Sequence, residues 1–522
     1  MIDFVCCAGG PAGTGIITIG ETLGKLFQRM GWYVFTHDKY QSIIKGGHNA
    51  IYTRICEEQI FAHRHDVDIL IALDKLSIDR HVHELTEKGV ILYNKKAVTD
   101  YNYPKTGIGI DFDDMATKCG NIKYSNMVAV GCVLALIDES KITLSYLEKI
   151  LEQKFGKKGK EIVEGNMNAV KAGYNYVKEN NIHIESAKIT PKDQKNHLFL
   201  TGNQAIVLGA IKAGVKLLAQ YPMTPASSIL DTMASFELAK NIVVRQPEDE
   251  LACMNMIIGA GAAGIRAMTA TSGGGFSLMV EALGFAAIAE VPCVVVESQR
   301  SGPSTGMPTH QDQADLRFVM HASQGDFPRI VITPGCVSEC FYLTFEAFNL
   351  AEIYQTPVII LVDKYLSSSF QTVDYYDMSN LKVNRGLLLS DEDAEKVSNY
   401  KRYLITDSGI SPRIIPGQKN GMHVDSSYEH DETGYTTENE IEREKQVLKR
   451  ARKLDSLSEV ITAPKIYGNP NAKVAVVCWG STKMPAQEAI KILKKEGIDV
   501  AVVHFRFILP FPKNKAKEIL LK

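Results

Sequence analysis

The chain has 522 residues, and its 58 Lys and Arg residues nearly balance 60 Asp and Glu residues, which gives a formal net charge of −2. Without an excess of positive charge, the sequence offers no electrostatic basis for binding nucleic acid or an anionic membrane surface. The hydrophobic content of 45% and the charged content of 23% are typical of globular proteins. At roughly 150 residues per domain, this length predicts three to four domains.

The N-terminus and the cysteines indicate a cytoplasmic protein. Residues 1–5 contain an early acid and no basic segment, unlike a secretory signal peptide. The longest apolar stretch, 276–296, is interrupted by Glu281, Glu290 and Pro292, so it is a poor candidate for a membrane span. Most of the ten cysteines lie in apolar runs and none forms a Cys-x-x-Cys motif, which is typical of free thiols in reducing compartments. We therefore expect no metal or iron–sulfur cluster held by this chain.

Residues 1–185 show apolar runs that alternate with helical patterns. Strands are expected at 2–8, 32–36, 67–73 and 90–93, and helices at 16–27 and 76–85. Such alternation predicts a parallel sheet covered on both faces. The glycine-rich segment 9–15 joins the first strand to the first helix. It is either a tight turn or a phosphate site, because backbone amides at a helix N-terminus can hold an anion.

A second α/β unit is expected over residues 198–390. Its strands are expected at 266–271, 293–297, 329–333 and 358–362, with helical patterns between them. Asn203 is the expected N-cap of a helix over 204–219, and Ser228 has capping-box spacing to Asp231 at the next helix. The pattern is that of a doubly wound α/β domain.

The composition turns polar from 391 to 465, where apolar periodicity is absent until a charged helix at 440–457. We expect this connection to lie on a surface or on a partner. A third α/β unit over 466–522 shows strands at 474–479 and 499–505 and a helix at 486–496. Because two strands do not form a stable sheet, this unit either leans on the rest of the chain or belongs to a longer one.

For each of two segments in the second unit, the sequence allows either a purely structural role or a chemical one. The loop Tyr221-Pro222-Met223-Thr224-Pro225 is either a plain proline turn or a stiff support for the Thr224 hydroxyl, since proline restricts itself and the residue before it. The acids of Gln246-Pro247-Glu248-Asp249-Glu250 either favour the start of a helix or include a buried glutamate poised for proton transfer.

Two strand ends offer further candidates. Thr271, Ser272 and Gly273 end one strand and open a helix, a position where α/β sheets commonly bind ligands. Arg300 follows the next strand, where it is either a lone surface arginine or a bidentate ligand for a carboxylate. His310 lies in the same loop, as a polar bystander or a catalyst.

A literal G-x-G-x-x-G occurs at 259–264, but in the wrong context for a dinucleotide site. The residues before it follow Pro247 and three acids, the pattern of a starting helix rather than of a strand. We interpret these small residues as close helix packing, which disfavours an NAD-dependent dehydrogenase.

Taken together, the motifs resemble the alpha subunits of 2-oxoacid:ferredoxin oxidoreductases in which a gamma domain is fused at the N-terminus. The gamma-type features are the turn 9–15, SIIKGGHN at 42–49 and DILIALD at 68–74. The alpha part contains the YPMTP, QPEDE and TATSGGG motifs, SQRSGPSTGMPT at 298–309, GISPR at 409–413 and EHDE at 429–432. The resemblance covers nearly the whole chain in the family's order.

The resemblance implies a fold of several doubly wound parallel-sheet domains. These are a gamma-type domain over 1–185, a thiamine diphosphate pyrimidine-binding domain over 198–390, the polar connection 391–465 and a partial transketolase C-terminal-like domain over 466–522. The implied reaction is oxidative decarboxylation of a 2-oxoacid with coenzyme A, which yields acyl-CoA, CO2 and reduced ferredoxin. GISPR and EHDE resemble the 2-oxoglutarate-type branch, so 2-oxoglutarate or a broad range of 2-oxoacids is expected. The alternatives are a pyruvate- or branched-chain-specific enzyme and a non-catalytic assembly protein that keeps the fold.

The resemblance also implies roles for individual residues. Glu248 would hydrogen-bond the aminopyrimidine ring of thiamine diphosphate, and Arg300 and Thr224 would bind the carboxylate and carbonyl of the substrate. Further cofactor contacts are expected from Tyr221, Pro222, Thr271, Ser272 and Gly273. Lys45 is expected to close the site or to meet coenzyme A.

A separate beta subunit would complete the enzyme. It would hold the diphosphate, its Mg2+ and a [4Fe-4S] cluster, since this chain has no Gly-Asp-Gly motif and no cluster cysteines. Electrons would pass from that cluster to ferredoxin. The expected assembly is a dimer of alpha–beta heterodimers, without nucleic acid or membrane partners.

Overall fold

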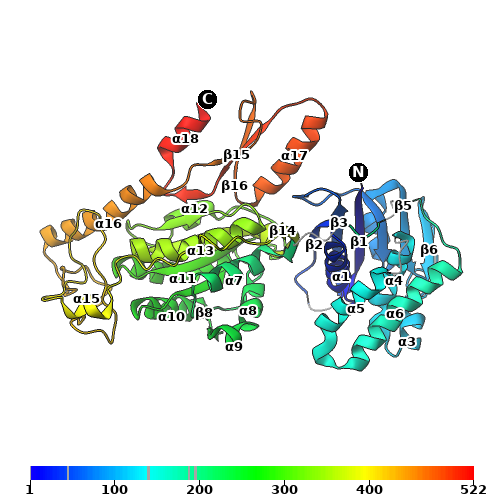
Figure 1. Cartoon of the computed structure of the whole chain (residues 1–522), viewed down its shortest axis with the longest axis horizontal. Helices are drawn as coiled ribbons and strands as arrows, with labels where there is room; N and C mark the ends of the chain where they lie inside the picture. Colours follow the sequence, from blue (N-terminus) through cyan, green and yellow to red (C-terminus); the bar gives the residue numbers. More distant parts are fainter. Residues whose placement is uncertain (1, 44–45, 138–141, 186–188, 193–196, 522) are drawn as a thin grey trace. The chain divides into compact units, whose positions relative to one another are not determined.

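The computed structural model describes residues 2–43, 46–137, 142–185, 189–192 and 197–521, so Lys45 lies outside the described residues. The chain forms two compact α/β units (Figure 1). One comprises Met1–Leu200 with Ser369–Tyr375, and the other comprises Thr201–Ser368 with Tyr376–Lys522. Among the described helices, none has both the length and the apolar content needed to cross a membrane.

The first unit is built on an eight-stranded mixed sheet. The strands β1, β4, β5 and β6 are parallel, whereas β3, β2, β14 and β7 are joined to the sheet by antiparallel pairings. The prediction of a parallel sheet is therefore wrong for the predicted strand 32–36, which corresponds to β2. In order across the sheet, the strands are β6 (Thr106–Ile110), β5 (Leu85–Asn94), β4 (Val67–Ala72), β1 (Asp3–Ala12), β3 (Gly46–Cys56), β2 (Tyr33–Lys39), β14 (Gln371–Asp374) and β7 (His197–Leu200). The long strand β3 has no counterpart among the predicted strands. Nor does the sequence pattern indicate that β7 and β14, which fall mostly within the expected 198–390 unit, pair here.

Six α-helices accompany this sheet in the described ranges. They are α1 (Ile16–Arg29), α2 (Lys75–His81), α3 (Phe112–Lys118), α4 (Ser125–Ile137), α5 (Ile142–Phe155) and α6 (Lys160–Glu179), with short 3-10 turns η1 (Val82–Glu84), η2 (Ile122–Tyr124) and η3 (Gly156–Lys158). All but the first residue of α4 is buried, which fits its apolar sequence. The glycine-rich segment 9–15 is divided between strand and turn: β1 continues to Ala12, and Gly13 and Gly15 then adopt positive φ values of 92° and 83° before α1.

The second unit contains a seven-stranded sheet that is parallel except for β18. In order, its strands are β18 (Phe507–Leu509), β12 (Ile330–Ile332), β13 (Pro357–Asp363), β11 (Cys293–Gln299), β10 (Ala267–Thr271), β8 (Leu217–Ala219) and β9 (Val243–Arg245). Its helices are α7 (Gly202–Lys212), α8 (Ser227–Ala234), α9 (Glu237–Lys240), α10 (Glu250–Ala262), α11 (Gly273–Ile288), α12 (Leu316–His321), α13 (Val337–Tyr354) and α14 (Lys364–Ser368). The four predicted strands correspond to β10, β11, β12 and β13. Apolar residues of α10 and α11 are buried against one face of the sheet, which accounts for the predicted alternation.

Both helix starts predicted for this unit are wrong. Thr201, rather than Asn203, caps α7, through a capping box with Gln204. The helix α8 begins without a side-chain cap. Asn203 instead donates hydrogen bonds of 2.9 Å to the Pro225 carbonyl and to the Ser228 hydroxyl. Asn203 therefore holds the proline loop to the start of α8, where Ser228 accepts its hydrogen bond.

The C-terminal region leans on the larger sheet, in agreement with one of the two expectations for it. Its three-stranded sheet consists of β15 (Lys465–Gly468), β17 (Ala501–Phe505) and β16 (Ala475–Trp479), in that order, accompanied by η4 (Gly480–Thr482), α17 (Lys483–Lys495) and α18 (Lys513–Leu520). The strand β18 then pairs with β12 of the seven-stranded sheet. The buried Lys483 also forms an ion pair of 2.8 Å with Glu339 of α13.

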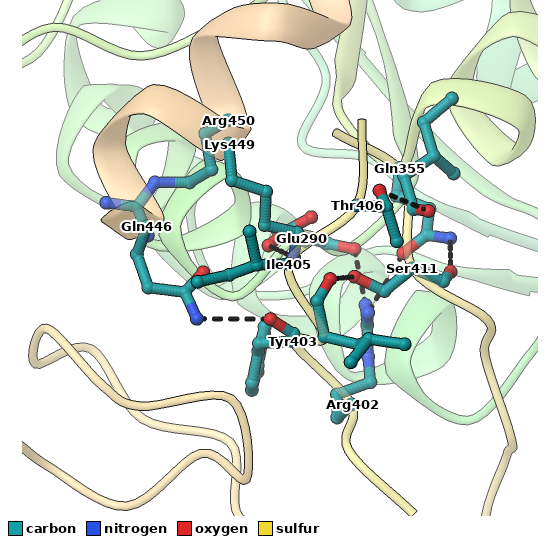
Figure 2. Close-up of polar contacts among 12 residues, drawn as sticks. Glu290, Gln355, Arg402, Tyr403, Ile405, Thr406, Ser411, Gln446, Lys449 and Arg450 are labelled. Atoms are coloured by element: carbon teal, nitrogen blue, oxygen red, sulfur yellow. Dashed lines mark hydrogen bonds and ion pairs between the residues drawn. The ribbon is translucent and has the colours of Figure 1, made fainter. Parts of the chain in front are cut away.

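The polar connection packs on the second unit through buried charges, around its helices α15 (Asp391–Glu395) and α16 (Glu440–Val460). Glu290, just beyond α11, lies with its carboxylate 2.6 Å from Lys449 and 2.5 Å from Lys453, and all three side chains are fully buried or nearly so. Figure 2 shows Arg402 in the same cluster, where it donates to the Glu290 carbonyl at 2.7 Å and to the side chain of Gln355 at 2.9 Å. Cations thus face the C-terminal ends of α11 and α13, the polarity that helix dipoles favour.

Removing one charge from this buried cluster should destabilise the second unit, because the remaining buried charges lose their partner. We expect Glu290→Ala to lower the free energy of unfolding by about 3–5 kcal/mol, because it leaves buried lysines without their counter-charge. Urea titration followed by circular dichroism measures the change. The control is Glu395→Ala, which removes the exposed partner of Lys419 and should cost at most about 1 kcal/mol. Equal effects of the two variants would contradict this account.

Candidate active site

The candidate site lies at the carboxyl-end edge of the seven-stranded sheet, where β10 and β11 end side by side. Thr271, the last residue of β10, is paired in register with Glu297 near the end of β11. The chain leaves β10 through Ser272, the N-cap of α11. Ligands commonly bind α/β sheets at this edge, so the predicted position of the site agrees with the fold.

The acidic segment before α10 places Glu250 inside the protein and Glu248 outside it. Asp249 caps the helix, and its side chain accepts a hydrogen bond of 2.9 Å from the Ala252 amide. Glu250 is only 2% exposed, and its carboxylate accepts a 3.4 Å hydrogen bond from the Thr271 hydroxyl. Glu248 is exposed. The structure therefore does not support Glu248 as the buried acid, because the cap turns it toward solvent before the helix begins.

Helical spacing is the signal that could have identified Glu250. The buried residues of α10 include Cys253, Met254, Ile257 and Ile258, and Glu250 precedes them on the same stripe at intervals of three and four. An acid that continues a buried apolar stripe is a stronger candidate than one that precedes the helix cap.

The first turn of α11 approaches Glu250 closely because of a glycine. An ideal Cβ at Gly275 would lie 2.1 Å from the Thr271 hydroxyl and 2.3 Å from a carboxylate oxygen of Glu250. The buried hydroxyl of Ser272 has no hydrogen-bond partner among the described residues. The sheet edge therefore contains the Ser272 hydroxyl, which has no partner among the described residues, and the Glu250 carboxylate, which accepts one long hydrogen bond. Both groups can form hydrogen bonds to a polar heterocycle.

The proline loop reaches this edge through Met223, whose sulfur lies 3.8 Å from the Thr271 hydroxyl. A hydrogen bond spans the loop, because Gln220, just before it, donates to the carbonyl of Ala226, just after it, at 2.9 Å. Tyr221 and Pro222 are exposed, whereas Thr224 is half-buried. The structure therefore brings the proline loop to Thr271 through Met223 and leaves Tyr221 and Pro222 exposed.

Arg300 completes the cluster from the loop after β11. Its guanidinium donates a 2.8 Å hydrogen bond to the carbonyl of Thr224, and its buried Nε has no partner in the described part of the chain. Burial lowers the pKa of Arg300, and the nearby Asp315 and Glu297 oppose that effect. The structure therefore brings Arg300 and Thr224 together, through the backbone carbonyl of Thr224. His310 is exposed in the same loop.

The G-x-G-x-x-G segment does not form a dinucleotide site. Residues 259–262 belong to α10, and Gly264 follows the end of that helix with a φ of 80°. An ideal Cβ at Gly261 would lie 2.4 Å from the Pro292 carbonyl oxygen. The interpretation as close packing is therefore confirmed at Gly261. Across the described ranges, no group of three or more His, Cys, Asp or Glu residues is arranged to hold a metal ion.

Three family models match the chain in succession. Residues 5–176 match the pyruvate ferredoxin/flavodoxin oxidoreductase domain, and residues 208–450 match the thiamine diphosphate-binding domain of pyruvate flavodoxin/ferredoxin oxidoreductases. Residues 467–522 match the transketolase C-terminal domain. The second match contains the whole edge cluster described above.

Curated relatives and a solved structure match along nearly the whole length. The 2-oxoacid:ferredoxin oxidoreductase subunit alpha of a Sulfolobus species is 32% identical, over 98% of this chain and 88% of its own. The 2-oxoglutarate synthase subunit KorA of Methanocaldococcus jannaschii is 36% identical over 62% of this chain and 86% of its own. The 2-oxoglutarate:ferredoxin oxidoreductase from Magnetococcus marinus, solved with 2-oxoglutarate, coenzyme A and succinyl-CoA bound, matches with a TM-score of 0.89 and 30% identity, over 99% of this chain and 90% of its own. The chain therefore belongs to the family of 2-oxoacid:ferredoxin oxidoreductase alpha subunits, which are parts of multi-subunit oxidoreductases.

Proposed function

We propose that this chain supplies the pyrimidine-binding half of the active site in a coenzyme A-acylating 2-oxoacid:ferredoxin oxidoreductase. The observation that carries the proposal is the buried Glu250 beside Thr271, together with Arg300, which is hydrogen-bonded to the proline loop whose Met223 contacts Thr271. The reaction is oxidative decarboxylation of a 2-oxoacid with coenzyme A, which yields acyl-CoA, CO2 and reduced ferredoxin.

The substrate we favour is 2-oxoglutarate or a broad range of 2-oxoacids. Supporting this preference, a relative solved with 2-oxoglutarate bound aligns over 99% of the chain, and several KorA relatives are 2-oxoglutarate synthase subunits. A pyruvate- or branched-chain-specific enzyme is the second candidate, since two of the matching family models are named for pyruvate. Assaying the purified two-subunit complex with a panel of 2-oxoacids separates them.

We assign to Glu250 the hydrogen bond to the aminopyrimidine ring that sequence analysis gave to Glu248. Thiamine diphosphate, when bound, supplies a nucleophilic carbon and an electron sink for the loss of CO2. A buried carboxylate can hold a proton at a ring nitrogen, because low polarity strengthens the hydrogen bond between them. Thr271 orients Glu250, and the unpartnered hydroxyl of Ser272 offers a further contact at the turn into Gly273.

Arg300 is assigned to the carboxylate of the 2-oxoacid, with the Thr224 side chain near the carbonyl of the substrate. One guanidinium nitrogen is already bonded to the Thr224 carbonyl, which fixes the plane of the group. The unpartnered Nε and the remaining N–H groups are donors suited to a bidentate carboxylate.

The remaining parts of the enzyme belong to partners in this proposal. A beta subunit holds the diphosphate, Mg2+ and a [4Fe-4S] cluster, and ferredoxin accepts the electrons. The assembly is a dimer of alpha–beta heterodimers in the cytoplasm. Lys45 of the gamma-type domain remains the candidate for closing the site or meeting coenzyme A.

The two glutamates of the acidic segment form a matched pair for testing the assignment. We expect Glu250→Gln to lower kcat of the two-subunit complex by about 10²–10⁴-fold, because an amide cannot replace the carboxylate in proton transfer. Glu248→Gln should change kcat less than twofold (about the effect of a neutral surface change). Steady-state reduction of ferredoxin measures both. A loss confined to Glu248→Gln would restore the original assignment and reject ours.

The approach of α11 to Glu250 can be tested with neighbouring glycines. Gly275→Ala should displace the carboxylate and weaken thiamine diphosphate binding by at least about tenfold, since its Cβ would lie within 2.3 Å of Glu250. Gly274→Ala is the control, because the nearest atom to its Cβ would be 3.9 Å away. Isothermal titration of the cofactor into the complex compares them, and similar affinities would argue against the proposed geometry.

The substrate role of Arg300 predicts a selective effect on the Michaelis constant. Arg300→Ala should raise the KM for the 2-oxoacid by about 10–100-fold, the loss of charge-assisted hydrogen bonds. The KM for coenzyme A should change much less. The exposed Arg317, replaced by alanine, is the control. Equal increases in both Michaelis constants would show that Arg300 is structural.

A further inference from the structure

Glu297 is a buried carboxyl for which the proposed function has no role. Its side chain is 0% exposed, although it lies on β11 near the edge of the sheet. On the same sheet face, Val295 and Leu361 belong to the apolar cluster under α10 and α11. An ionised carboxylate in such surroundings is strongly disfavoured, so it must be neutralised or paired.

The partner that the structure provides is a second carboxyl. Neither oxygen of Glu297 has a hydrogen-bond donor among the described residues. Asp315 is held at the same face of β11, because its backbone amide donates to the side chain of Gln299, two residues after Glu297. The side chain of Asp315 also raises the pKa of Glu297 as a charge and as a hydrogen-bond partner. Two ionised carboxylates are both acceptors and cannot bond to each other. The contact is a hydrogen bond only if one proton lies between the two groups.

The surroundings decide which carboxyl holds the proton. Asp315 lies against the first turn of the 16-residue helix α11, since an ideal Cβ at Gly273 would be 2.5 Å from its Oδ2. A helix N-terminus favours negative charge at that position. The backbone amide of Asp315 donates to the Gln299 side chain at 3.1 Å, which fixes the residue there. Glu297 lies on the apolar sheet face, and its oxygens accept no hydrogen bond from the described residues, so we take it as the protonated member.

The charges around the pair agree with this assignment. Burial raises the pKa of Glu297 well above its usual range, Asp315 and Asp363 raise it further, and Arg300 opposes them. Burial also raises the pKa of Asp315, whereas the hydrogen bond from Glu297 and the charge of Arg300 lower it, and the nearby Asp312 raises it. The remaining acid at this edge, Glu250 of α10, faces Thr271.

We propose that Glu297 and Asp315 share one proton and present a single negative charge to Arg300, keeping its guanidinium available for the carboxylate of the substrate. The inference rests on the proposed function of Arg300. If both carboxyls were ionised, the guanidinium would already face two negative charges, and a 2-oxoacid would add another. With one proton held on Glu297, the charge of Asp315 orients Arg300 without blocking an incoming anion. Glu297 is therefore a positioning residue that acts through Arg300.

The protonation state of the pair can be measured without turnover. The infrared difference spectrum between the wild-type two-subunit complex and its Glu297→Gln variant should contain the C=O band of a protonated carboxylic acid at neutral pH. A difference that contains only carboxylate bands would overturn the shared proton.

The link to substrate is tested by the pH dependence of KM. At a pH at which the acid band disappears and Glu297 is therefore ionised, the KM of the wild-type complex for the 2-oxoacid should rise by at least about tenfold, the effect of an added like charge. Glu297→Gln keeps a neutral donor to Asp315, and its KM should stay low at high pH. The ratio of the two KM values at each pH removes effects that the variants share, such as ionisation of coenzyme A. Glu346→Gln is the control, because Glu346 of α13 also has a pKa raised by burial but lies beside Arg506.

These outcomes separate the inference from the proposed function. A KM ratio that stays flat across the pH range in which the acid band disappears would overturn the link between the pair and Arg300. A rise that appears equally in Glu346→Gln and Glu297→Gln would do the same. Absence of turnover with every 2-oxoacid would overturn the proposed function and the substrate role of the pair, whereas the infrared spectrum would still decide whether the pair shares a proton.

Discussion

The candidate site at the carboxyl-end edge of the seven-stranded sheet depends on the close approach of the first turn of α11 to the end of β10. Gly275 permits this approach, since any side chain there would overlap the Thr271 hydroxyl and the Glu250 carboxylate. On the other side of the same turn, Gly273 leaves room for Asp315. One glycine-rich turn therefore lies against two carboxyl groups in different environments. The carboxylate of Glu250 accepts one long hydrogen bond from Thr271, and the carboxyl of Asp315 is paired with Glu297.

The helix α11 runs from this sheet edge to the polar connection, residues 391–465. Its N-terminus faces Asp315, and the residues just beyond its C-terminus meet Arg402, Lys449 and Lys453. Both arrangements follow the helix dipole, with an anion at one end and cations at the other. The charged segment that looks like a solvated linker in the sequence thus contributes buried counter-charges to the domain that contains the site.

The sequence predicts four of the seven strands of the second sheet, because these buried parallel strands are short apolar runs that local periodicity reveals. It misses β8, β9 and β18, and β8 lies within the predicted helix 204–219. It does not predict β3, β7 and β14, whose pairing partners are distant in the chain or antiparallel. Capping was also mispredicted: Asn203 and Ser228 have side chains suited to caps, but tertiary hydrogen bonds to the proline loop win. Arg300 and Thr224 were proposed as site residues through the family's motifs, and their roles remain a prediction. Glu248 was chosen over Glu250 because a motif alone does not tell which acid faces inward, whereas helical spacing from Cys253 and Ile257 does.

The most direct test of the central claim is a structure of the two-subunit complex with thiamine diphosphate bound. The account predicts that a carboxylate oxygen of Glu250 lies within hydrogen-bonding distance of the aminopyrimidine ring, with Glu248 remaining outside the site. A ring bound to Glu248, or docked away from the edge formed by Thr271 and Gly275, would contradict it.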